Sequence, residues 1–190
     1  MLGADVCAIG LSMNDNYVPS ELEYCVLSVI WRIQPCTAYQ VRRAFQTSLT
    51  ASWRASTGSI YPLLRSLVAN GLVTQTAIPG DRRGSKALEM SAAGIRSLKS
   101  WLQDPASWIA EPVADPIRTR SYALPMLQPR ETRHLIKRWK AATEDSLREI
   151  GQRLDEYRAQ GNLVEERAHR GTQLQLTARV SWLEELLDDL

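Results

Sequence analysis

The 190-residue sequence contains no long apolar run. No stretch approaches the roughly 20 apolar residues that span a bilayer, and the segment from Met1 to Val18 is interrupted by aspartate and asparagine side chains. The sequence therefore predicts neither a membrane anchor nor a signal peptide. Apolar residues make up 44% of the chain and charged residues 23%, which is typical of a folded protein rather than a disordered one.

Cysteine and histidine are also scarce. The cysteines, Cys7, Cys25 and Cys36, are odd in number and form no CxxC pair. With only His134 and His169 as further ligands, the sequence predicts no metal site, no other cofactor and a reduced, cytoplasmic setting. Cys25 lies in an apolar helix stripe and is expected to be buried, whereas Cys36 lies in a turn and is expected to be the more exposed thiol.

Residue arrangements typical of enzymes are missing as well. The sequence has no nucleophile with a base and an orienting partner, no metal-ligand spacing and no glycine-rich loop that could cradle a phosphate. We therefore expect a protein that is not an enzyme.

Positive charge is concentrated in the first half of the chain. Residues 20–100 contain ten lysines and arginines against four acidic residues, whereas residues 106–190 contain thirteen against fourteen. The chain as a whole carries a net charge of only +2. A polyanionic partner is therefore expected to bind the first half.

Apolar periodicity predicts three short helices before Gly71. The first begins at Ser20 with the spacing of a capping box and ends before Pro35. The second is capped by Thr37, and the third begins near Ser59. Short connections between such helices are typical of a compact trihelical unit.

After Gly71 the side-chain pattern changes to a period of two residues, which predicts a β-hairpin. Residues 72–78 and 85–91 read as strands, and residues 79–84 form a turn rich in glycine and charge. A fourth helix is predicted from Ser91 to about Asp104. The order helix, helix, helix, hairpin, helix is typical of a winged helix-turn-helix DNA-binding domain, which we assign to residues 20–104.

The rest of the chain is predicted to be helical. Residues 1–19 are expected to be an N-terminal extension, residues 105–116 a proline-rich linker, and residues 117–190 an α-helical dimerisation domain. The predicted fold class is therefore mainly α with a small β-hairpin. Because an apolar stripe close to a heptad pattern needs a surface to pack on, a second copy of the chain is the simplest candidate. The expected dimerisation residues are Ile136, Trp139, Leu147, Ile150, Leu154, Trp182, Leu183 and Leu186.

The third helix and the hairpin tip contain the candidate DNA-binding residues. The start of a recognition helix contacts base edges in the major groove, while a basic hairpin tip suits the phosphates of the adjacent minor groove. A plainer interpretation stays open, in which Ser56 or Thr57 only caps the helix, Tyr61 only fills the core and the tip is a solvated turn. The candidates are Ser56, Thr57, Ser59, Tyr61 and Arg65 on the helix and Arg82, Arg83 and Lys86 on the tip.

Residues 56–67, Ser-Thr-Gly-Ser-Ile-Tyr-Pro-Leu-Leu-Arg-Ser-Leu, followed by residues 70–73, resemble the recognition-helix signature of PadR-like transcriptional regulators. Residues 35–41 are similar to the family's loop into its second helix, and residues 90–94 resemble its step from the hairpin into the next helix. The motif includes Pro62, which the resemblance adds to the DNA-binding candidates. 

The C-terminal part resembles the α-helical domain of the longer, virulence-activator-like members of the family, over residues 116–157 and 182–185. Two positions depart from the family pattern. Ala38 stands where the family usually has glycine, and Ala87-Leu88 stand where tyrosines are common. The departures concern the geometry of the hairpin rather than the fold.

The resemblance implies a homodimeric, sequence-specific DNA-binding regulator, more often a repressor than an activator, that reads an inverted repeat in a promoter. A two-fold dimer agrees with this, because it presents two recognition helices about 34 Å apart, one turn of DNA. The expected location is the cytoplasm, in association with the nucleoid. The rival hypothesis is a winged-helix protein-interaction module without specific DNA binding.

The resemblance also implies a small aromatic or amphiphilic effector that releases the DNA. Trp139 and Trp182 are the candidate effector-binding residues, and Trp101 and Trp108 could line the same pocket. A tryptophan on an apolar helix face is more often ordinary core or interface packing, so both interpretations stay open.

Overall fold

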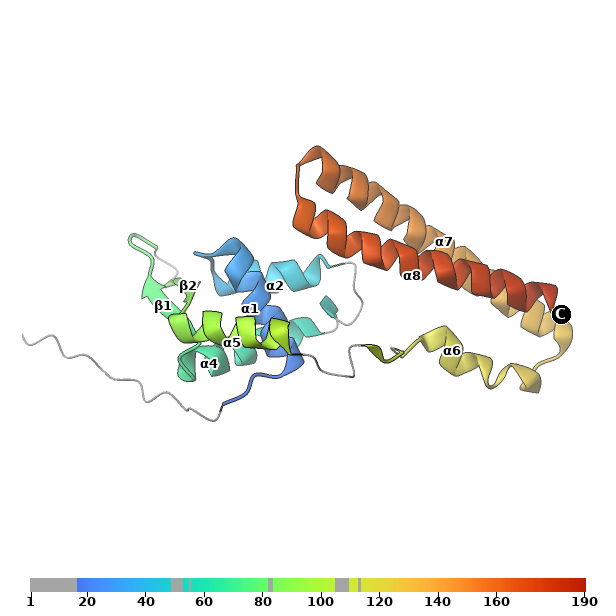
Figure 1. The fold of residues 1–190 in the computed structure, drawn as a ribbon, viewed down its shortest axis with the longest axis horizontal. Helices are drawn as coiled ribbons and strands as arrows, with labels where there is room; N and C mark the ends of the chain where they lie inside the picture. The colour runs from blue at the N-terminus through green and yellow to red at the C-terminus, as the bar shows by residue number, and fades with distance from the viewer. Residues whose placement is uncertain (1–16, 49–52, 55, 82–83, 105–109, 113) are drawn as a thin grey trace, which may run out of the picture. The chain divides into compact units, whose positions relative to one another are not determined.

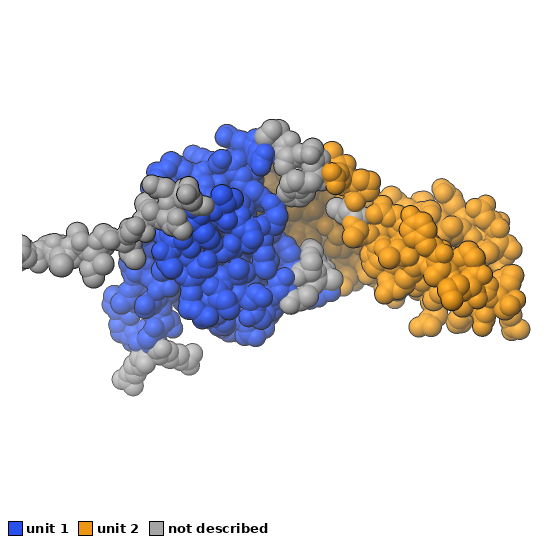
Figure 2. Space-filling view, turned by 90° about the horizontal axis from the view of Figure 1, so that it is seen from below, with its two compact units in different colours: residues 1–109 blue, residues 110–190 orange. Residues whose placement is uncertain are grey.

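The computed structural model describes residues 17–48, 53–54, 56–81, 84–104, 110–112 and 114–190. The chain divides into two compact units, residues 1–109 and 110–190 (Figures 1 and 2). The described residues are mainly helical and contain a single two-stranded antiparallel sheet, so the predicted fold class, mainly α with a small β-hairpin, is confirmed. No helix in these ranges is long and apolar enough to cross a membrane.

The first unit contains helices that begin at side-chain caps read from the sequence. The hydroxyl of Ser20 accepts from the amide of Glu23 and that of Thr37 accepts from the amide of Gln40, which completes a capping box at the start of each of the first two helices. Ser91 caps the last helix of the unit through the amide of Gly94. The elements are α1 (Glu21–Ile33), α2 (Ala38–Gln46), the 3-10 turn η1 (Ser56–Ser59), α4 (Ile60–Ala69), β1 (Val73–Ala77), β2 (Lys86–Met90) and α5 (Ala92–Gln103).

One apolar core joins these helices to the hairpin. Two aromatic stacks extend it: the ring of Tyr24 lies 5.0 Å from that of Trp101, and the ring of Phe45 lies 4.6 Å from that of Trp53. The fully enclosed side chains come from α1, α2, α4 and β1, and they are Val26, Leu27, Val29, Ile30, Val41, Phe45, Ile60, Leu67 and Val73. Burial of this set holds α4 against α1 and α2.

The loop between α1 and α2 pairs with the hairpin and corrects one prediction. The amide of Cys36 donates to the carbonyl of Leu88 at 3.1 Å, and the amide of Leu88 donates back to Cys36 at 2.7 Å. This bridge encloses Cys36, which is 2% exposed, so the expectation of an exposed thiol there is wrong. Cys25, expected to be buried, is only half-buried. Burial raises the pKa of the Cys36 thiol, which disfavours the thiolate form.

The second unit is a helical hairpin with a short helix beside it (Figure 1). Gly161 reverses the chain between its two long helices, in a left-handed conformation with φ of 64° that glycine adopts without strain. The elements are α6 (Pro116–Ser121), the 3-10 turn η3 (Leu124–Met126), α7 (Pro129–Ala159) and α8 (Leu163–Asp188). The long helices pack along each other and form the most extensive contact between elements of the chain's described part.

Four of the expected dimerisation residues lie in the contact between α7 and α8. Ile136, Ile150, Leu154 and Leu183 are buried within a single chain, because the apolar stripe of each long helix faces the other. These four side chains have almost no exposed area to offer a second copy. The other four expected dimerisation residues, Trp139, Leu147, Trp182 and Leu186, are half-buried.

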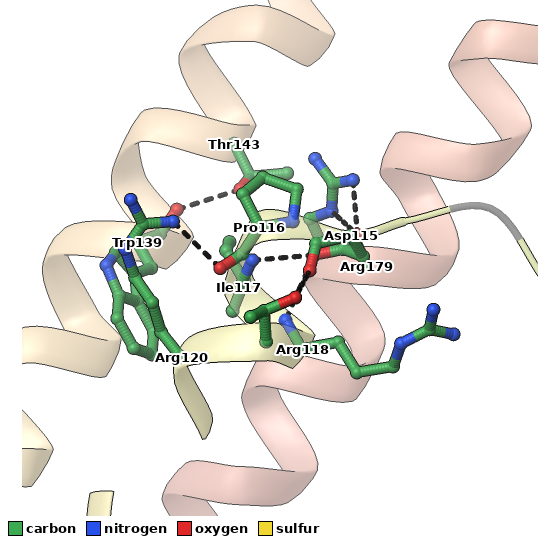
Figure 3. Close-up of polar contacts among 9 residues, drawn as sticks. Asp115, Pro116, Ile117, Arg118, Arg120, Trp139, Thr143 and Arg179 are labelled. Atoms are coloured by element: carbon green, nitrogen blue, oxygen red, sulfur yellow. Dashed lines mark hydrogen bonds and ion pairs between the residues drawn. The ribbon is translucent and has the colours of Figure 1, made fainter. Parts of the chain in front are cut away.

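Asp115 attaches α6 to α8 (Figure 3). One oxygen of its carboxylate accepts the amides of Ile117 and Arg118 at 2.8 and 3.1 Å, and the other accepts Nε of Arg179 at 2.9 Å. Partial burial raises the pKa of Asp115, but these hydrogen bonds and the charge of Arg179 outweigh it, so the pKa lies below its usual value. Within the expected linker, residues 105–109 and 113 lie outside the described residues.

Candidate nucleic-acid interface

Helix α4 has one buried side and one exposed side. Ile60, Leu64 and Leu67 are buried, and this spacing leaves the opposite side to Tyr61, Pro62, Arg65 and Ala69, which we call the α4 face. Tyr61 is 41% exposed, so it does not simply fill the core. Arg65 is exposed and forms no hydrogen bond or ion pair with any residue of the chain's described part.

The turn η1 leads into α4 and holds the three hydroxyl candidates. Ser59 is exposed and stands at the N-cap position of α4, but its side chain makes no capping hydrogen bond. Ser56 and Thr57 are half-buried, and the Thr57 hydroxyl donates to the carbonyl of Arg54. Ser59 is therefore the most exposed of the three hydroxyl residues.

The hairpin β1–β2, the wing, places Lys86 beside this helix. Lys86 is exposed at the first residue of β2, and its Nζ donates to the side-chain carbonyl of Gln75 across the strands at 3.1 Å. Arg82 and Arg83 lie outside the described residues. On either side of them Gly80 and Gly84 have φ of 76° and 67°, which only glycine adopts readily, so the turn is built from residues that permit a tight reversal.

A cavity of about 340 Å³ lies between the starts of α2 and α4 and the wing. It brings together Tyr61 and Lys86, which were candidates from sequence, with Tyr39, which was not. Tyr39 lies in the first turn of α2 and is 58% exposed. The signal that could have found it is a large aromatic residue two positions after the Thr37 cap, in the first turn of the helix that precedes the recognition helix.

The chemistry of this cavity suits an anion. Its polar lining consists of hydroxyl, amide and ammonium groups and includes no carboxylate. Hydroxyl and ammonium groups donate hydrogen bonds to phosphate oxygens, and a lysine neutralises their charge. The polar residues of the lining are Thr37, Tyr39, Tyr61, Gln75, Ser85 and Lys86.

Residues 26–100, which contain most of the described elements of the first unit, match the sequence model of the family described as "Transcriptional regulator PadR-like family". These residues belong to the PadR-like family of transcriptional regulators. Regulators of this family are DNA-binding proteins without enzymatic activity, which agrees with the expectation that the chain is not an enzyme. A comparison with curated protein sequences finds no match.

Solved structures of PadR-like proteins have the same fold as this regulator. The structure of Bacillus subtilis PadR in complex with operator DNA is 22% identical, has a TM-score of 0.77 and covers 88% of this chain and 97% of its own. The same protein in complex with p-coumaric acid is 21% identical, with a TM-score of 0.72, covering 87% of this chain and 93% of its own. The Vibrio cholerae virulence activator AphA is 20% identical, with a TM-score of 0.69, covering 88% of this chain and 96% of its own. The winged-helix architecture is thereby confirmed.

The tryptophans expected at an effector site have different surroundings. Trp139 and Trp182 are half-buried in the second unit, on α7 and α8. A hollow of about 330 Å³ on this unit has a largely charged lining that includes neither tryptophan. Trp101 stacks on Tyr24 and donates from Nε1 to Glu21 at 2.9 Å, so its role in the first unit is packing. Trp108 lies outside the described residues.

Proposed function

We propose that this PadR-like regulator acts as a homodimeric repressor that binds an inverted-repeat operator through α4 and the wing. The observation that carries the proposal is the α4 face, which is exposed and lies next to a cavity lined by Tyr39, Tyr61 and Lys86. In this assignment the start of α4 enters the major groove and Arg65 reaches a guanine or a phosphate.

The remaining residues of the interface have supporting roles. Tyr39, Tyr61 and Lys86 contact the phosphates next to the groove, and Arg82 and Arg83 extend the contact from the wing. The hydroxyl of Ser59, with those of Ser56 and Thr57, is close to the start of α4, where backbone amides also favour phosphate. A related protein, Bacillus subtilis PadR, forms a complex with operator DNA, which supports DNA as the partner here.

The homodimer supplies the symmetry that an inverted repeat requires. The side chains available for it in the second unit are the half-buried ones, Trp139, Leu147, Trp182 and Leu186. The exposed Leu174 of α8 adds apolar area of the kind that dimers bury. Such a regulator acts where the chromosome is, in the cytoplasm and associated with the nucleoid.

The proposal includes a small aromatic or amphiphilic effector that releases the operator. Bacillus subtilis PadR forms a complex with p-coumaric acid, which is a molecule of this class. Trp139 and Trp182 are the residues we assign to it, because a half-buried indole offers an apolar face to a planar ligand.

Selection of binding sites from a random duplex pool at about 150 mM salt tests the function. Light scattering on the same sample gives the oligomeric state, and the Arg138→Ala variant serves as a control because Arg138 is an exposed cation of the second unit. Enrichment of an inverted repeat by a dimer is the expected result. Arg65→Ala should enrich a site with a relaxed preference at one base position per half-site, whereas Arg138→Ala should enrich the same site as the wild-type chain. Failure of a folded dimer to enrich any site would favour the protein-interaction module instead.

A further inference from the structure

Tyr17 connects the chain before α1 to helix α4. Its hydroxyl forms a short hydrogen bond with the carboxylate of Glu23 and lies 3.0 Å from the hydroxyl of Ser66. Glu23 is only 7% exposed, and it also accepts the amide and the hydroxyl of Ser20, each at 2.9 Å. We call these four residues, Tyr17, Ser20, Glu23 and Ser66, the Tyr17 cluster. It joins α1 and α4, two helices that also share the apolar core.

The direction of the hydrogen bonds in the cluster follows from the number of protons that each side chain can donate. The carboxylate of Glu23 can only accept, so the single proton of the Tyr17 hydroxyl is donated to it. In a hydrogen bond between the two hydroxyls Ser66 is then the donor, and Ser66 also interacts with the carboxylate of Glu23. The three side chains therefore form one connected network.

Apolar packing is not directional, so it does not by itself fix the rotation of α4 about its axis, and a hydrogen bond is needed for that. Ser66 follows Arg65 directly on α4, so a rotation of the helix about its axis moves both residues together. The end of a long side chain lies roughly 6 Å from the axis of its helix, and a rotation of about 10° displaces it by roughly 1 Å. Donor and acceptor of a good hydrogen bond lie within a window of about half an ångström, so such a rotation breaks a base contact.

We propose that Tyr17 is a positioning residue that sets the rotation of α4 and thereby the specificity of DNA recognition. The inference rests on the proposed function, in which α4 reads bases. Tyr17 itself does not touch DNA in this assignment; it acts through Ser66. The cluster holds the α4 face at one angle, so that Arg65 meets a single base position in each half-site.

Three variants remove the contact, and one matched variant controls for stability. Ser66→Ala removes the hydroxyl of Ser66 and with it the contact to Tyr17. Tyr17→Phe keeps the ring but also removes the hydrogen bond to Glu23, and the double variant removes both hydroxyls. Ser97→Ala is the control, because the hydroxyl of Ser97 forms the corresponding contact between α5 and α1, 3.3 Å from the hydroxyl of Tyr24. Each protein is measured against the selected inverted-repeat duplex and against a scrambled duplex of the same length and composition.

We expect Tyr17→Phe and Ser66→Ala to lower affinity for the selected duplex about fivefold, the lower end of what one base contact contributes. Affinity for the scrambled duplex should change less than twofold, and the double variant should be no worse than either single one. Ser97→Ala should leave the ratio of the two affinities unchanged. Equal losses of affinity for both duplexes would show a merely structural role and overturn the proposal. A lower ratio of affinity for the selected duplex to affinity for the scrambled duplex in Ser97→Ala would do the same.

A second readout does not depend on DNA. Amide hydrogen exchange in the free protein should accelerate in α4 for Tyr17→Phe and not in α5, whereas Ser97→Ala should show the reverse. Unchanged exchange in α4 overturns the positioning role even if the operator is never found. If the wild-type chain prefers no duplex while exchange in α4 responds as expected, the failure lies with the proposed function and not with the cluster.

Discussion

Replacement of Gly94 by alanine is expected to destabilise the first unit strongly. Gly94 lies in the first turn of α5, where an ideal Cβ would stand 2.1 Å from the carbonyl oxygen of Leu72 and 3.0 Å from its carbon. Both are backbone atoms, so no side-chain rotation relieves the overlap. The same oxygen accepts the amide of Ser91 at 3.0 Å, and a shift of α5 away from Leu72 weakens that hydrogen bond as well.

The size of the effect follows from three contributions. Overpacking of a well-packed site costs about 1–3 kcal/mol, and a rigid backbone neighbour places Gly94→Ala at the upper end. A weakened buried hydrogen bond adds about 1 kcal/mol, and the better helix propensity of alanine offsets about the same amount. The net loss is about 3 kcal/mol of unfolding free energy, which corresponds to a Tm lowered by roughly 12–24 °C in a domain of this size.

Thermal unfolding followed by circular dichroism measures the effect, with Gly171→Ala as the matched control. Gly171 is an exposed glycine within α8, and a Cβ there would meet nothing within 4 Å. Alanine at that position is expected to stabilise its helix by about 0.5–1 kcal/mol. A Gly94→Ala protein that melts at or above the wild-type temperature would refute the close approach of α5 to Leu72.

Three further predictions concern DNA binding and pH. Arg65→Ala is expected to weaken operator binding by about 1–3 kcal/mol and to relax the preference at one base position per half-site, which a panel of single-base operator variants would reveal. Lys86→Gln should weaken binding to all sequences alike and reduce the slope of log affinity against log salt by about one unit; a change at one base step only would mean direct reading instead. Because the folded pKa of Asp115 is lowered, its contribution to stability is complete above the unfolded value and is lost as pH falls below about 4. Asp115→Asn should therefore flatten the acid limb of the stability curve of the second unit, and an unaltered limb would contradict the ion pair with Arg179.

Much of the first unit could be predicted because its signals are local. A capping box acts over three residues, so Ser20 and Thr37 identified the starts of α1 and α2 from sequence alone. The change from helical to alternating periodicity likewise predicted the hairpin, whose strands the structure places at residues 73–77 and 86–90. Apolar spacing on α4 also predicted which side of it is buried, and therefore which residues form the α4 face.

The sequence by itself thus determined the order of the elements, their caps and the apolar side of each helix, because these depend on residues three or four positions apart. Only the tertiary structure decided which surfaces meet. Cys36 is buried because a distant strand pairs with its loop, Ile136 and Leu154 are buried where α7 packs on α8, and Tyr17 reaches Ser66 across 49 residues of sequence. Such contacts depend on how apolar faces from distant parts of the chain pack together. Apolar attraction is not directional, so a local sequence pattern does not indicate which faces meet.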